Sequence, residues 1–106
     1  MAVSIDVRVS GGVANMAVRG DIDERAAEDL KRAFRGVSLT GLRRFELDFH
    51  EVTHIGSAGI GKLLLFYKDL AAVGAQMHIV NVSPLISSLL REMRLDSIIT
   101  ISAKSA

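Results

Sequence analysis

Residues Glu46 to Leu65 read E-L-D-F-H-E-V-T-H-I-G-S-A-G-I-G-K-L-L-L, and this stretch decides the fold. Its first part alternates apolar and polar residues as a strand does, and its last part carries apolar residues at helical spacing. A short loop separates the two parts, and Ser57, Ala58 and Gly59 open the helix. The stretch therefore predicts a strand, a loop and a helix with one serine at its start.

The residues before this stretch predict a β-hairpin and a first helix. Apolar residues alternate with polar ones over residues 3–9 and 14–18, and two glycines lie between the runs. The second strand is expected to break at Gly20. Asp23 is placed to cap a helix whose apolar residues recur from Ala26 to Val37.

The residues after the stretch predict two further strands and a third helix. Residues 76–82 form a nearly continuous apolar run, which is typical of an interior strand buried on both faces. Ser83 and Pro84 supply an N-cap and a first-turn proline for the third helix. Residues 98–101 predict a last short strand, and residues 103–106 are expected to fray.

This order of elements predicts an α/β fold, a single domain over residues 1–106 with a mixed four- to five-stranded sheet, an N-terminal β-hairpin and three or more helices. The formal net charge is +1 and the basic residues are scattered, so no nucleic-acid partner is expected. The sequence has no cysteine, no membrane-length apolar run and no signal-peptide pattern. We expect a soluble cytoplasmic protein without membrane insertion.

The segment from Gly56 to Lys62 also satisfies G-x-x-x-x-G-K, the pattern of a phosphate-binding loop. That motif needs Ser or Thr after the lysine to bind magnesium, and Leu63 stands there instead. Gly61 and Lys62 also fall inside the predicted helix, whereas in a phosphate loop they open it. Nucleotide hydrolysis is therefore disfavoured, and a nucleotide-binding protein is kept as an alternative class.

No enzyme active site is predicted. His50, His54 and His78 are the candidate metal ligands, but no carboxylate-rich spacing surrounds them, so we expect no metal and no other cofactor. Ser57 lacks a nucleophile-elbow sequence, and no histidine is specifically placed to activate it. Asp48, at the end of a central strand, is expected to bond nearby backbone groups.

Three motifs together resemble the signature of the STAS domain, most closely that of the bacterial anti-sigma factor antagonists. Leu47-Asp48-Phe49 is similar to the end of the family's central strand, and residues 57–61 are similar to its helix opening, Asp-Ser-Ser/Ala-Gly-Leu/Ile-Gly. Residues 20–23 resemble its Gly-x-Leu/Ile-Asp turn. The resemblance covers roughly the whole chain, and its main departure is Gly56, where the family usually has aspartate.

The resemblance implies a function in partner switching. Ser57 would be phosphorylated by an anti-sigma factor that is also a serine kinase, and a serine phosphatase would reset the system. The unphosphorylated protein would bind the kinase and so free the sigma factor. The implied partner-binding residues are Asp21, Asp23, Gly56, Ser57, Ala58, Gly59, Gly61 and Lys62.

Structural alternatives stay open beside this interpretation. Ser57 is also a favoured N-cap residue, and Asp21 and Asp23 are ordinary turn and cap residues. The alternative to a switch is a non-switching STAS scaffold in a signalling assembly or a lipid-transport complex. If the first two helices both follow strands of one sheet, Asp21, Asp23, Gly56, Ser57 and residues 59–62 should converge on one exposed edge.

Overall fold

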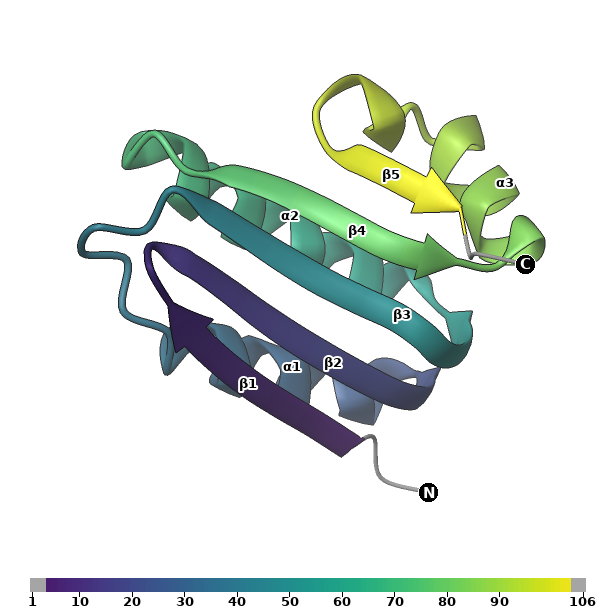
Figure 1. The fold of residues 1–106 in the computed structure, drawn as a ribbon. Coiled ribbons are helices and arrows are strands. Elements are labelled where there is room, and N and C mark those ends of the chain that lie inside the picture. Colours follow the sequence, from purple (N-terminus) through teal and green to yellow (C-terminus); the bar gives the residue numbers. More distant parts are fainter. Residues whose placement is uncertain (1–3, 104–106) are drawn as a thin grey trace.

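Five strands form one mixed sheet in the computed structural model, which describes residues 4–103 (Figure 1). The strands are β1 (Ser4–Ser10), β2 (Val13–Ile22), β3 (Arg44–Ile55), β4 (Gln76–Val82) and β5 (Thr100–Ala103). They lie side by side in chain order; β1 pairs antiparallel with β2, and the other neighbours pair parallel. The predicted α/β fold with an opening hairpin is confirmed. Of residues 103–106, which were expected to fray, Ala103 is the last residue of β5 and pairs with Val82, and residues 104–106 lie outside the described residues.

Each parallel pair of strands is joined through a helix. The helices are α1 (Glu24–Arg35), α2 (Ser57–Ala72) and α3 (Pro84–Glu92), and a short 3-10 helix, η1 (Leu95–Ser97), precedes β5. The Asp23 carboxylate accepts the N–H of Ala26 at 2.8 Å, and the Ser83 hydroxyl accepts that of Ile86 at 3.4 Å. The predicted caps of the first and third helices are therefore confirmed.

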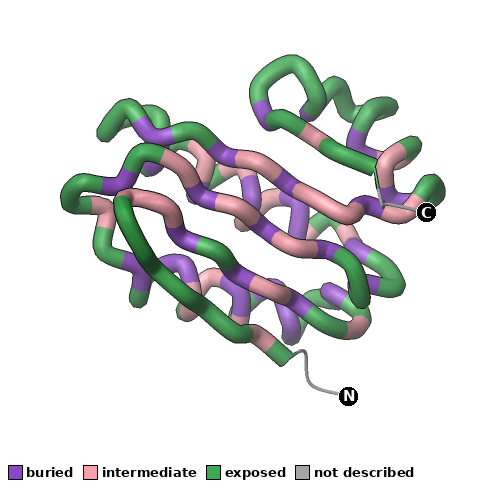
Figure 2. The backbone as a smooth tube through the Cα atoms, in the orientation of Figure 1, coloured by how far each residue is buried: buried purple, intermediate pink, exposed green. Residues whose placement is uncertain are grey.

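The core lies between the sheet and the helices. Figure 1 shows α1 and α2 behind the sheet, and Figure 2 shows buried positions alternating along the central strands. The rings of Phe34 in α1 and Phe66 in α2 stack 4.2 Å apart, and Phe45 of β3 meets both edge-on. These aromatic contacts fix the two helices against each other and against β3.

The strand β4 is not buried on both faces, so that prediction is wrong. Met77 and Ile79 are buried under the helices, whereas Gln76 is exposed and His78 is half-buried. The reason is that the helices α1 and α2 cover one face of the sheet and leave the other to solvent (Figure 1). A nearly continuous apolar run therefore does not distinguish a strand covered on two faces from one covered on a single face.

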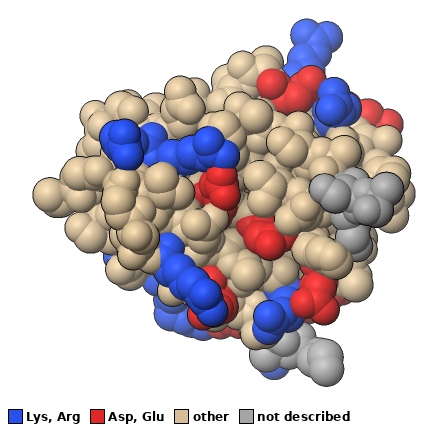
Figure 3. Space-filling view, in the orientation of Figure 1, with Lys and Arg blue, Asp and Glu red and all other residues tan. Residues whose placement is uncertain are grey.

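The open face of the sheet is polar and internally paired. Asp48 accepts the N–H of His50 at 2.9 Å and the side-chain amide of Asn81 at 3.0 Å, as expected of a structural aspartate. Arg19 and Glu51 form an ion pair at 2.8 Å between β2 and β3. Figure 3 shows positive and negative side chains interspersed on this face. Such mixing leaves no basic patch in this view.

Two strands run further than the sequence predicts. The strand β2 continues through Gly20 to Ile22, and β3 continues to Ile55, so no loop precedes α2. The pairing of β2 with β3 shifts register between Ala17 and Arg19 and again after Gly20, whose φ is 105°. These irregularities accommodate the residues that interrupt the apolar–polar alternation. The pairing of β2 with β3 therefore resumes beyond them.

Candidate functional site

The carboxyl ends of β2 and β3 bring the starts of α1 and α2 together. In the parallel register Asp21 lies opposite His54, and Ile22 lies opposite Ile55. The backbone N–H of Gly56 then donates to the carbonyl oxygen of Ile22 at 3.0 Å. The two segments therefore meet at one edge as predicted, but Gly59 and Ile60, which were expected to be exposed there, are buried. We call this edge, with Asp21, Asp23 and residues 54–62, the switch edge.

Ser57 is exposed and is the first residue of α2, while Gly56 is the N-cap. The structural alternative in which Ser57 is the N-cap is therefore wrong. The first backbone bond of α2 runs from the N–H of Ile60 to the carbonyl of Gly56 at 3.1 Å. Within residues 4–103, no acceptor meets the N–H groups of residues 57–59 or the Ser57 hydroxyl. The start of α2 is thus uncapped, unlike those of α1 and α3.

Gly59 is buried, and its lack of a side chain lets α2 approach the sheet. A Cβ atom on Gly59 would lie 2.7 Å from Cγ2 of Ile22 and 3.0 Å from Cγ1 of Ile55. Gly61, two residues on, faces open space. Gly59 therefore allows the close packing of α2 against the sheet beneath the switch edge, and it is not available to contact a partner at the surface.

Two carboxylates come from the neighbouring segment of the switch edge. Asp21 is exposed, and its Oδ1 lies 3.3 Å from Nδ1 of His54, across the ends of β2 and β3. Asp23 is also exposed, and one of its oxygens caps α1. His54 is a member of the switch edge that the sequence analysis considered only as a metal ligand. The parallel register of the two strands was the signal that could have identified it.

Lys62 points to α1 and not to the start of its own helix. Its Nζ lies 3.2 Å from a carboxylate oxygen of Glu28. The hydrogen bond and the charge of Lys62 lower the pKa of the Glu28 carboxyl, and the charge of Lys31 lowers it further. Gly61 and Lys62 lie within α2, as predicted. The geometry of a phosphate-binding loop, with the lysine turned toward a phosphate at the helix start, is therefore not formed.

In the described part of the chain, no three His, Asp or Glu side chains group as potential metal ligands. Among residues 4–103, no helix is both long and apolar enough to cross a membrane. What the switch edge can offer chemically is an exposed hydroxyl, free backbone donors and two carboxylates.

Comparison with known proteins agrees with this architecture. The model of the STAS domain family matches residues 4–106. A STAS-domain containing protein of Pseudomonas aeruginosa, PA14_20770, is 26% identical over 102 residues, which are 96% of this chain and all of that protein.

Three solved structures share the fold. An anti-sigma factor antagonist from Mycobacterium paratuberculosis has a TM-score of 0.83 at 23% identity, with 94% of this chain and 85% of that chain covered. The Bacillus cell fate determinant SpoIIAA in its phosphorylated form has a TM-score of 0.73 at 15% identity, with 95% of this chain and 93% of that chain covered. A sulfate transporter family protein from Wolinella succinogenes has a TM-score of 0.76 at 18% identity, with 90% of this chain and 80% of that chain covered. With the family model matching all but its first three residues, this chain belongs to the STAS domain family.

Proposed function

We propose that the chain is a cytoplasmic anti-sigma factor antagonist that works by partner switching, with Ser57 as the phosphorylated residue. The observation that carries this proposal is the exposed Ser57 at a helix start whose first N–H groups meet no acceptor in residues 4–103. A phosphate there lies at the positive end of the helix dipole and adds about −1.5 to −2 charges. The fold therefore tolerates the phosphate while its surface changes.

The partner is an anti-sigma factor that is also a serine kinase. The Oγ of Ser57 attacks the γ-phosphorus of the ATP held by that kinase, a new O–P bond forms, and ADP leaves. The hydroxyl proton passes to a base of the kinase. A serine phosphatase later transfers the phosphoryl group to water, which restores Ser57 and releases inorganic phosphate.

Release of the partner follows from charge and bulk at the switch edge. Asp21 and Asp23 already place two exposed carboxylates on the switch edge that carries Ser57. A phosphate therefore concentrates negative charge on a surface that the partner must approach and desolvate. No rearrangement of the fold is required, because the switch acts on the docking surface itself.

Membership of the STAS family and the fold shared with an anti-sigma factor antagonist support this role. The fold shared with a Bacillus protein solved in phosphorylated form supports its compatibility with a phosphate. A binding module is also favoured over an enzyme, because neither a metal-ligand cluster nor a phosphate-loop geometry is formed by residues 4–103.

A non-switching scaffold is the second candidate, and Gly56 favours it. The family usually has aspartate directly before the phosphorylated serine, and this chain lacks that carboxylate. The shared fold of a sulfate transporter family protein fits a scaffold or adaptor equally well. In that case the switch edge binds a partner without being modified.

A pull-down from the host cell, followed by mass spectrometry, tests the choice. We expect a bound serine kinase of the anti-sigma type and a phosphate on Ser57. The variant Ser57→Ala should lose the phosphate, whereas Ser88→Ala, which removes an exposed serine of α3, should keep it. Recovery of transporter subunits with an unmodified Ser57 would favour the scaffold instead.

A further inference from the structure

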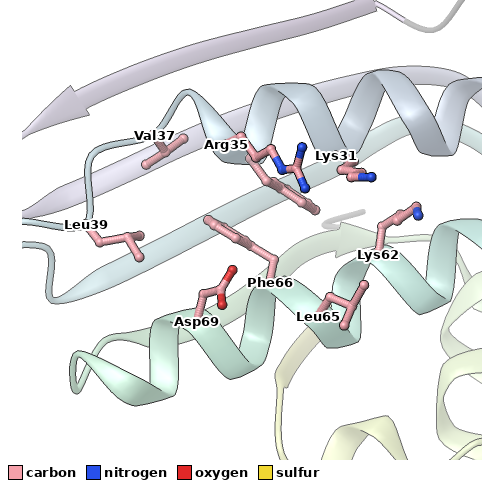
Figure 4. Close-up of a pocket in the computed structure, with 9 residues that line it drawn as sticks. Lys31, Arg35, Val37, Leu39, Lys62, Leu65, Phe66 and Asp69 are labelled. Atoms are coloured by element: carbon pink, nitrogen blue, oxygen red, sulfur yellow. The ribbon is translucent and has the colours of Figure 1, made fainter.

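A groove with a volume of about 410 Å³ runs between α1 and α2, on the side of the molecule opposite the open sheet face (Figure 4). Sites for small organic ligands commonly have volumes of about 300–1,000 Å³. The groove is distinct from the exposed hydroxyl of Ser57, although Lys62 lines it. Its lining divides into a cationic end and an apolar end.

Three cations gather at one end of the groove. Lys31 and Arg35 lie on successive turns of α1, and Lys62 extends from α2 toward α1 (Figure 4). Lys62 is paired with Glu28 at 3.2 Å. By contrast, no carboxylate of residues 4–103 lies within 4.0 Å of the charged nitrogens of Lys31 or Arg35. Glu28 also interacts with the charge of Lys31, so three cations share one carboxylate and this end of the groove keeps a net positive charge.

The other end of the groove is apolar. The stacked rings of Phe34 and Phe66 form its floor, and Val37 and Leu39 extend the apolar lining beyond them (Figure 4). Leu65 stands on the rim with 57% of its surface exposed. An exposed leucine beside an aromatic floor is apolar surface that a ligand could remove from water.

Asp69 is the single carboxylate among the lining residues, and Figure 4 places it toward the apolar end. Three cations against one carboxylate leave a positive lining, even when Glu28 beside Lys62 is counted with it. The positive and apolar ends lie along one groove. This arrangement complements a molecule with an anionic head and an apolar chain.

We propose that the groove between α1 and α2 binds a small amphiphilic carboxylate, such as a medium-chain fatty acid. The carboxylate lies between Lys31 and Arg35, where the guanidinium can donate two parallel hydrogen bonds. The alkyl chain lies over Phe66 toward Val37 and Leu39. A volume of about 410 Å³ is that of a small-molecule site, which favours a free small molecule over a segment of a partner protein.

Decanoate, kept below its micelle concentration, is the probe for a titration of the isotope-labelled protein followed by NMR. We expect saturable shifts at the groove residues with millimolar affinity or better. Decyltrimethylammonium, with the same chain and a cationic head, should not compete, and acetate should bind far more weakly. No partner protein is present, so the result is independent of any role of Ser57.

Charge-matched variants locate the head of the ligand. Arg35→Gln and Lys31→Gln should each raise the Kd for decanoate at least about tenfold. Arg32→Gln on α1 and Lys68→Gln on α2 remove the same charge outside the groove lining and should leave the Kd unchanged. All four positions lie on helix surfaces, and thermal melts will show that the variants fold.

Two further variants test the apolar end and the charge balance. Leu65→Ala should weaken decanoate binding, and Asp69→Asn should strengthen it. The proposal is overturned if decanoate gives no saturable shifts, if the cationic amphiphile binds equally well, or if Arg32→Gln weakens binding as much as Arg35→Gln. It is also overturned if phosphatidylglycerol vesicles bind the groove while free decanoate does not.

Discussion

The hydrogen bond from the backbone N–H of Gly56 to the carbonyl of Ile22, at 3.0 Å, ties the start of α2 to the end of β2. It extends the β2–β3 ladder one step beyond the paired residues Ile22 and Ile55. Because Asp23 follows Ile22 and Ser57 follows Gly56, the same bond holds the two helix starts side by side. The geometry of the switch edge is thus a consequence of strand pairing.

The closeness of α2 to the sheet predicts that Gly59→Ala destabilises the protein. The added methyl group would overlap Ile22 and Ile55, and overpacking of a core costs about 1–3 kcal/mol. A gain in helix propensity of up to about 1 kcal/mol offsets part of that cost. We expect a net fall in the free energy of unfolding, measured by urea denaturation.

Gly61→Ala is the matched control on the same helix. A methyl group there meets no atom within 4 Å, so only the gain in helix propensity remains. We expect the free energy of unfolding to rise by about 0.5–1 kcal/mol. Equal effects of the two substitutions would contradict the role assigned to Gly59.

Gly56→Asp should stabilise the protein slightly. The backbone of Gly56 has φ −95° and ψ 177°, which any residue adopts, and a Cβ would lie 3.9 Å from the nearest atom, the carbonyl oxygen of Ile22. The carboxylate can accept a hydrogen bond from the free N–H of Ala58 or Gly59, and its negative charge interacts favourably with the positive end of the helix dipole. Urea denaturation should show a gain of about 0.3–1 kcal/mol, reduced by repulsion from Asp21 and Asp23.

Gly56→Asn separates the two contributions, since it supplies a cap without a charge. Gly56→Asn should keep the part of the stability gain that comes from capping. Its gain should not depend on salt concentration, whereas the charge contribution of Gly56→Asp is screened by salt. A loss of stability in both variants would show that the start of α2 is not the uncapped helix end described above.

The sequence predicted the order of elements because apolar periodicity and caps are local signals. Asp23 and Ser83 each precede a helical pattern and do cap it. The ends of β2 and β3 could not be placed in the same way. Gly20 reads as a break, yet a register shift keeps it inside the strand, and this depends on pairing with residues about thirty positions away.

The same reasoning explains what was predicted of the switch edge and what was not. Ser57 and Gly59 were identified by a motif, but only the packing of Gly59 against Ile22 separates a shaping residue from a surface residue. The pairing of His54 with Asp21 depends on the exact register of two strands. Likewise, the cations of the α1–α2 groove meet only because the two helices pack together.

His78 predicts a dependence of stability on pH. Burial and the charge of Arg44 lower the pKa of its imidazole, and Glu46 opposes them in part. Below about pH 6.5 the unfolded state therefore binds more protons at this residue than the folded state does. The contribution of His78 to the free energy of unfolding consequently falls as the pH drops through this range.

His78→Gln should remove this contribution while keeping a side chain that can hydrogen bond. Urea denaturation at about pH 7.5 and about pH 5.5 compares the two proteins on either side of the ordinary histidine pKa. The wild type should lose more stability on acidification than the variant. Contributions from the rest of the chain are common to both proteins and cancel from the comparison.

The position of Lys62 predicts that the purified protein does not hydrolyse nucleotides. Lys62 is paired with Glu28 of α1, and Leu63 has no hydroxyl to hold magnesium. Assays of phosphate release from ATP and GTP should therefore stay at background. Turnover that disappears in Lys62→Ala would overturn this conclusion, whereas weak binding without turnover would leave it intact.

Ser57→Asp and Ser57→Ala separate a switch from a scaffold. The Ser57 hydroxyl makes no hydrogen bond within residues 4–103, so Ser57→Ala should change the free energy of unfolding by less than about 0.5 kcal/mol. An aspartate in the first turn should be neutral or stabilising by up to about 1 kcal/mol. Thermal melts on the three proteins check both expectations.

The affinities of the same variants for the kinase recovered by pull-down should differ, although their stabilities are similar. Ser57→Asp places negative charge where the partner docks, so its affinity should fall at least tenfold, which is about 1.4 kcal/mol. Ser57→Ala should bind like the wild type and resist phosphorylation, and Ser88→Asp, with the same charge change on α3, should bind normally. Calorimetric titrations measure these affinities. If Ser57→Asp binds as tightly as the wild type and cells contain no phosphate on Ser57, the switch hypothesis is wrong. The protein is then a scaffold whose partner binds the same edge without any modification of Ser57.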